Sequence, residues 1–248
     1  MTEPTTLFKA EWGSRAYGTD TPQSDRDLIQ VVIETPNYIT GLDEFRPKHS
    51  STAPDGERSH SEDTDLVTYG LKHYAALAVE GNPQVMATLF MSDFIEKHRL
   101  FSLLQDKRHI AVSRQAGRKY LGYMTSQKLR ITGEKNRSTN RPELVALHGW
   151  DTKFGAHAVR LGFQGVELLT TGEIQLPMEG LALETCRDIR AGKWTKEDGL
   201  DLIEHLEEDL KYAIDHSDLP DHGDRITMSK ILHDIYTYEW QTDYDDPS

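Results

Sequence analysis

The hydrophobic pattern of this chain changes its period near residue 70, and that change limits the folds the chain can adopt. Before residue 70, short apolar segments alternate with polar residues or run unbroken for a few positions, as β-strands do. After it, apolar residues recur every three or four positions, as on the buried side of a helix. Strands followed by helices predict an α+β fold: a small sheet flanked by helices, then a mostly α-helical C-terminal half. The segments predicted as strands are residues 7–13, 25–34 and 63–69.

The predicted helices follow from the apolar period and from the positions of glycine and proline. The first begins at Leu71, and Gly81-Asn82-Pro83 ends it and starts the next, which continues to Phe90. The polar segment between Gly41 and Ser61 predicts either a mobile loop or a pair of weak edge strands. The apolar stripe of the first helix consists of Leu71, Tyr74, Ala75, Ala78 and Val79. Later helices are predicted at residues 98–106, 109–129, 142–172, 179–191, 195–216 and 225–240.

Charge is distributed unevenly along the chain. The net charge is −13, but residues 107–141 contain ten Lys and Arg against one acid, and residues 195–248 contain sixteen acids against four Lys and Arg. We predict a domain over residues 1–106 that holds the sheet, and a helical domain over residues 107–248 that is basic at 107–141 and acidic at 195–248. The basic segment can face a phosphate-bearing ligand, although a solvated helix face gives the same pattern.

The composition excludes several protein classes. No apolar run approaches the length of about 18 residues that a transmembrane helix needs. The first residues have neither the basic nor the apolar part of a signal peptide. Cys186 is the single cysteine, which excludes an internal disulfide and a cysteine-based zinc site. These features predict a cytoplasmic protein in a reducing compartment.

A glycine–serine pair and two aspartates carry the chemistry that the sequence predicts. Gly13-Ser14 ends the first predicted strand, where backbone N–H groups and a hydroxyl can hold a phosphate, and Gly13 permits close backbone approach. Asp25 and Asp27 lie two residues apart in the second strand, so their carboxylates point to the same face. Such carboxylates repel each other unless a cation or a proton separates them, and Mg²⁺ prefers oxygen ligands of this kind.

A third carboxylate would let the site hold two Mg²⁺ ions, as two-metal phosphoryl transfer requires. Asp65 in the third predicted strand is the natural candidate. Asp63 lies on the same face two residues earlier and remains an alternative, whereas Glu62 falls on the opposite face. The predicted catalytic and metal-binding residues are Asp25, Asp27 and Asp65.

These motifs resemble those of a known superfamily. Gly13-Ser-Arg-Ala-Tyr-Gly18 followed by Ser24-Asp-Arg-Asp27 resembles the polymerase-β-type nucleotidyltransferases, in particular a bacterial and bacteriophage branch of RNA-repair-pathway nucleotidyltransferases. Gly81-Asn82-Pro83 is similar to the same branch, and so are several later segments. Those segments are Asp151-Thr-Lys153, His157, Arg160-Leu161, Thr171-Gly172-Glu173 and Arg187-Asp-Ile-Arg190 with Gly192.

The resemblance implies both a fold and an activity. It implies a mixed-sheet nucleotidyltransferase palm covered by the helical domain. It also implies a Mg²⁺-dependent transfer of a nucleoside monophosphate from an NTP to an acceptor hydroxyl, with release of pyrophosphate. The branch implies an RNA acceptor, such as a tRNA end or a broken RNA. Two alternatives stay open: a protein hydroxyl as acceptor, and a catalytically silent module that binds nucleotide or RNA.

Further residues are candidates for binding the NTP. Lys153, His157 and Arg160 share one helix face and can bind phosphates, and the resemblance favours this role over solvated charges and a packed histidine. Arg15 can reach a triphosphate and Tyr17 can stack on a base; alternatively Arg15 forms a salt bridge and Tyr17 packs in the core. The predicted NTP-binding residues are Gly13, Ser14, Arg15, Lys153, His157 and Arg160.

The densest part of the basic segment predicts a loop between helices that either contacts a polyanionic acceptor or is simply solvated. Its residues are Lys128, Arg130, Lys135, Arg137 and Arg141. Trp150 and Trp194 are predicted to pack between helices rather than to stack on bases.

Overall fold

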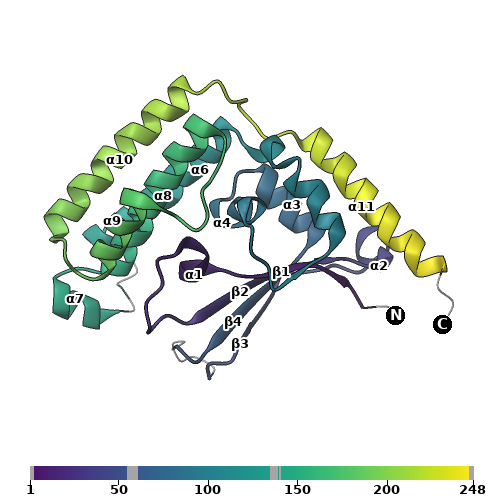
Figure 1. The fold of residues 1–248 in the computed structure, drawn as a ribbon, viewed down its shortest axis with the longest axis horizontal. Helices are drawn as coiled ribbons and strands as arrows, with labels where there is room; N and C mark the ends of the chain where they lie inside the picture. The colour runs from purple at the N-terminus through teal and green to yellow at the C-terminus, as the bar shows by residue number, and fades with distance from the viewer. Residues whose placement is uncertain (1–2, 55–60, 135–138, 140, 246–248) are drawn as a thin grey trace.

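The computed structural model describes residues 3–54, 61–134, 139 and 141–245, and it has the predicted α+β architecture (Figure 1). Among these residues the strands form a five-stranded sheet, and the helices gather on one side of it. The strands are β1 (Thr5–Glu11), β2 (Arg26–Ile33), β3 (Lys48–Ser51), β4 (Thr64–Gly70) and β5 (Glu96–Lys97). The helices of the N-terminal part are α1 (Gly13–Tyr17), α2 (Pro36–Ile39), α3 (Leu71–Val79), α4 (Pro83–Ala87) and α5 (Ser102–Gln105). The C-terminal half contains α6 (Arg114–Thr132), α7 (Pro142–His148), α8 (Thr152–Thr171), α9 (Gly180–Arg190), α10 (Lys196–His216) and α11 (Arg225–Asp245).

The sheet is mixed, as predicted, with the strand order β3-β4-β2-β1-β5. β2 pairs with β4 in parallel, and its register places Asp27 opposite Asp65. The other strand pairs are antiparallel. β3 confirms an edge strand within the segment between Gly41 and Ser61, of which residues 55–60 lie outside the described residues. β5 was not predicted, because two residues are too short to show a period.

The main core lies between one face of the sheet and the helices. Ile29, Val31 and Ile33 alternate along β2 and are buried in this core. All five residues of the predicted apolar stripe of α3 are buried against it. Asn82 then caps α4, accepting hydrogen bonds from two backbone N–H groups, and Pro83 begins that helix as predicted.

One predicted helix is in fact two. Residues 142–172 form α7 and α8, separated at Gly149, which adopts the left-handed conformation with a φ of +79°. Trp150 is buried, and the Asp151 side chain caps α8 by accepting from the backbone N–H groups of Lys153 and Phe154. The positive φ of Gly149 ends α7, and the Asp151 cap begins α8. The apolar period of the sequence continues across the break and does not reveal it.

The predicted basic loop is wrong for Lys128 and Arg130, whereas Arg141 does lie between two helices, α6 and α7. Lys128 and Arg130 lie on α6, and the Lys128 Nζ pairs with Glu204 at 3.1 Å and with Glu207 at 3.0 Å. Arg141 is buried and pairs with the cap residue Asp151 at 3.0 Å. Lys128 and Arg141 therefore hold secondary-structure elements together, and Arg130 lies over the Phe154 ring. Lys135 and Arg137 lie outside the described residues.

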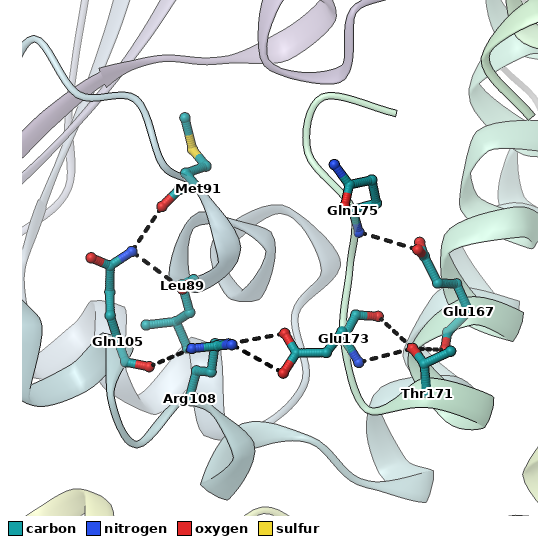
Figure 2. Close-up of polar contacts among 8 residues, drawn as sticks. All are labelled: Leu89, Met91, Gln105, Arg108, Glu167, Thr171, Glu173 and Gln175. Carbon is teal, nitrogen blue, oxygen red and sulfur yellow. Dashed lines mark hydrogen bonds and ion pairs between the residues drawn. The ribbon is translucent and has the colours of Figure 1, made fainter. Parts of the chain in front are cut away.

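Contacts between segments far apart in the sequence hold the fold together. The Arg108 guanidinium forms a two-point ion pair with Glu173, which follows α8, with both distances 3.0 Å (Figure 2). At the other end of the molecule, α11 packs beside α3 (Figure 1), and the Tyr236 hydroxyl donates to the buried Glu34 at 2.5 Å. α11 thus returns to the N-terminal part, and the boundary between residues 106 and 107 stays a prediction.

Within the described part of the chain, no helix combines the length and apolar character needed to cross a bilayer.

Candidate active site

Three aspartates meet at one end of the parallel strand pair. Asp27 lies near the start of β2, Asp65 near the start of β4, and Asp25 just before β2. Each offers a carboxylate oxygen, and these oxygens lie within 4.8 Å of one another. Asp63, the alternative third carboxylate, is outside this group, and its Oδ1 accepts from the Thr52 hydroxyl at 3.2 Å. A group of partly buried oxygen ligands fits a hard divalent cation.

The turn after β1 presses the backbone against Asp27. The Trp12 N–H donates to the Asp27 carbonyl at 2.8 Å. Gly13 has a φ of +61°, and a Cβ at this position would overlap the Asp27 carboxylate. The close approach expected at Gly13 is therefore present, but β1 ends at Glu11, and Gly13 and Ser14 begin the short helix α1 instead of ending a strand.

The surroundings of Asp27 disfavour its charged form. Partial burial, followed by the neighbouring charge of Asp25, raises the pKa of Asp27 to about 6, and Asp65 adds to the rise. Lys153 and Arg190 oppose it. A carboxyl group with this pKa is stabilised in its charged form when a cation binds beside it.

A pocket of about 190 Å³ adjoins the carboxylates, with walls from α1, α8 and α9. It brings most of the predicted NTP-binding residues together with Asp27. Its lining residues are Trp12, Gly13, Ser14, Tyr17, Thr19, Asp27, Gln84, Lys153, Ala156, His157, Arg160 and Arg190.

Arg15 is the predicted NTP-binding residue that is absent from this lining. It lines a different pocket together with Glu11 and Phe94, and its Nη1 lies 4.0 Å from the Glu11 Oε2. Successive residues of a helix point about 100° apart, so the helical turn at Ser14 directs the next side chain away from the carboxylates.

The three α8 residues differ in what they can offer a ligand. Burial lowers the pKa of Lys153, while Asp25 favours its charged form. Burial, then Arg160 and other nearby cations, lowers the pKa of His157 to about 3, which makes its ring neutral near pH 7. Arg160 is 6% exposed, donates to Gln164 and lies 3.8 Å above the Tyr17 ring. Tyr17 is thus a packed residue, and Lys153 is the α8 cation that faces the carboxylates.

Arg190 and Gln84 line the pocket, although neither is among the predicted site residues. The Arg190 Nη2 donates to the Ser24 hydroxyl at 2.9 Å, one residue before Asp25, and its charge acts on Asp25 and Asp27. The segment from Arg187 to Gly192 contributes to the family resemblance, but only the packing of α9 shows which of its cations reaches the site.

The chain is similar to several known proteins. The chain is 27% identical over 128 residues to an uncharacterized 38.9 kDa protein in the nrdC-mobD intergenic region of Enterobacteria phage T4, a match that spans 49% of this chain and 37% of that protein. A nucleotidyltransferase-like protein from Exiguobacterium sibiricum 255-15 has a crystal structure that aligns with 99% of this chain and 77% of its own, at 13% identity and a TM-score of 0.30. The model of the RNA repair pathway DNA polymerase beta family matches residues 2–231. The chain belongs to this family.

Proposed function

We propose that this chain is a Mg²⁺-dependent nucleotidyltransferase that moves a nucleoside monophosphate from an NTP to a hydroxyl at an RNA end and releases pyrophosphate. The observation that carries the proposal is the meeting of the Asp25, Asp27 and Asp65 oxygens within 4.8 Å beside a pocket with cationic walls. Membership of a polymerase-β-type family supports the reaction class, and the RNA-repair description of that family supports the acceptor.

The carboxylates fit a pair of Mg²⁺ ions. They are hard oxygen donors, they are crowded, and burial together with Asp25 already raises the pKa of Asp27. Asp25 and Asp27 would hold the ion shared with the phosphates, and Asp65 would join them to hold the second ion. When bound, the two ions would neutralise charge on the phosphates and on the attacking hydroxyl.

Residues of the pocket wall would bind the phosphates. The Ser14 hydroxyl and the Lys153 ammonium line the same pocket as Asp27, and both can donate hydrogen bonds to phosphate oxygens. His157, which is neutral, can make a hydrogen bond there without adding charge. The acceptor oxygen would form a bond to the α-phosphorus as the bond to pyrophosphate breaks, and the wall would hold the reacting groups in line.

The test is pyrophosphate release by the purified protein with Mg²⁺, each NTP in turn and mixed cellular RNA. Asp27→Asn keeps the shape of the side chain and removes its charge, so we expect a loss of at least about a hundredfold. Asp63→Asn is the matched control, because Asp63 stands near the site but outside the carboxylate group. Equal release by wild type and Asp27→Asn would rule out this mechanism.

The same assay separates the alternative functions. Nucleotide label that appears on RNA supports the proposed acceptor, and label on a polypeptide identifies a protein acceptor instead. Nucleotide that binds without pyrophosphate release, with RNA or protein present, identifies a silent binding module.

A further inference from the structure

Aromatic side chains of β4, α3 and α6 lie outside the carboxylate pocket, and the reaction proposed above does not use them. Tyr69 is the fourth residue after Asp65 on β4, so it lies on the same face of the strand at a distance of about 13 Å. Its ring stacks on His73 of α3, with the ring centres 5.9 Å apart and the planes at 28°. Tyr69 is partly exposed and His73 is exposed.

Tyr123 of α6 connects this stacked pair to the pocket. Its hydroxyl accepts a hydrogen bond from the Asn82 Nδ2 at 3.3 Å, and Asn82 caps the helix in which Gln84 lines the carboxylate pocket. Tyr123 is 36% exposed. Burial, and then the charge of Tyr123, raises the pKa of Tyr69. We call Tyr69, His73 and Tyr123 the aromatic surface.

Two exposed lysines are close in sequence to residues of the aromatic surface. Lys72 precedes His73 in the first turn of α3. Lys119 lies four residues before Tyr123 on α6, which puts both on the same side of that helix. Aromatic rings that are at least partly exposed, with exposed ammonium groups nearby in the sequence, match the bases and the phosphates of a nucleic acid strand.

We propose that the aromatic surface binds unpaired RNA nucleotides next to the acceptor end, so that the terminal hydroxyl reaches Asp65. This inference rests on the proposed nucleotidyl transfer. Every base has a face that stacks on tyrosine or histidine, so the surface tolerates different sequences. Bases within a duplex already stack on one another, so the surface selects an unpaired strand.

The test is the fluorescence anisotropy of a short labelled single-stranded RNA, titrated with the full chain without NTP. His73→Ala and Tyr123→Ala remove exposed rings, and each should weaken binding by about fivefold or more. Tyr123→Phe keeps the ring and should bind like the wild type. Tyr212→Ala is the matched control, because Tyr212 is 65% exposed and stacks on His216 at 3.9 Å, but on α10.

Two results would overturn the proposal: wild-type affinity in both His73→Ala and Tyr123→Ala, or equal binding of a duplex of the same RNA. Binding of Mg²⁺ and NTP is measured in parallel and should be unchanged in all variants. If the wild-type protein binds RNA through these rings but never binds NTP, the proposed reaction is contradicted and the proposed RNA-binding surface is still supported. Normal NTP binding with ring variants that bind RNA normally would contradict only the surface.

Discussion

At the scale of single residues, Gly13 is the position where a small change should have the largest effect. It combines a φ of +61° with direct contact to the Asp27 carboxylate. We expect Gly13→Ala to lose about 1–2 kcal/mol of unfolding free energy through backbone strain. It should also lose at least about tenfold in pyrophosphate release, because the new methyl group displaces the carboxylate.

Gly172→Ala separates the two effects. Gly172 has a φ of +75°, but a Cβ there would meet nothing within 4 Å. Thermal or urea unfolding should show a similar loss of stability in both variants, and pyrophosphate release should fall only in Gly13→Ala. A fully active Gly13→Ala protein would show that the contact with Asp27 does not set the geometry of the site.

His157 should make the stability of the protein depend on pH. Its pKa is lowered to about 3 in the folded state, below the usual value of about 6.5 that it regains on unfolding. Below pH 6.5 the unfolded chain binds a proton that the folded chain does not, so stability present at neutral pH is lost as the pH falls. This residue can contribute at most about 1.4 kcal/mol per pH unit.

The measurement compares urea unfolding of wild type and His157→Gln at pH 7 and pH 5. Other groups titrate in the same range, and they cancel in the difference between the two proteins. The loss on going to pH 5 should be smaller in His157→Gln. An equal loss in both would mean that His157 is protonated as readily in the fold as in the unfolded chain.

The sequence identified those site residues whose positions follow from local spacing. Asp25 and Asp27 stand two residues apart at the start of β2, and Gly13-Ser14 precedes them closely. Arg15 does not line the carboxylate pocket, because the direction of its side chain depends on whether the turn is helical. Arg190 could not be assigned, because it reaches the site only through the packing of α9, far along the chain.

At the scale of elements, Asp151 stabilises the start of α8 through two kinds of contact. It caps the helix and pairs with the buried Arg141. Asp151→Ala should therefore cost about 3–5 kcal/mol, because it leaves a buried guanidinium without its anion. Thr195→Ala removes only the cap of α10 and should cost about 1 kcal/mol. Urea unfolding of both variants checks the difference, and equal costs would mean that the ion pair adds nothing.

The elements themselves were predictable where a period or a cap dominates. The stripe of α3 and the Asn82-Pro83 start of α4 follow from side-chain spacing and capping alone. The break between α7 and α8 does not follow from spacing, because apolar residues continue across it. It is produced by Gly149 and the buried Trp150. The basic segment shows the same limit, since charge along a sequence does not reveal which cations meet acids on another helix.

At the scale of the whole molecule, the last helix is fixed to the second strand. The Tyr236 hydroxyl donates to the buried Glu34 carboxylate, and the Trp240 Nε1 donates to the Glu34 carbonyl at 3.0 Å. Tyr236→Phe keeps the ring but removes a donor from a buried acid, so it should cost about 1–3 kcal/mol. Tyr212→Phe, at an exposed position, should change unfolding by less than about 0.5 kcal/mol. Equal stability of the two variants would show that the contact with Glu34 does not hold α11.

The attachment of α11 also affects when the fold can be completed during synthesis on the ribosome. Glu34 belongs to the segment directly after β2, whereas its partner Tyr236 is translated about two hundred residues later. At typical translation speeds of about 5–20 residues per second, the early part of the chain spends ten seconds or more without this partner. The contacts that hold the end of β2, the strand that carries Asp27, are therefore complete only after nearly all of the described chain has emerged. We expect a nascent chain to reach its active fold late in synthesis and in one step.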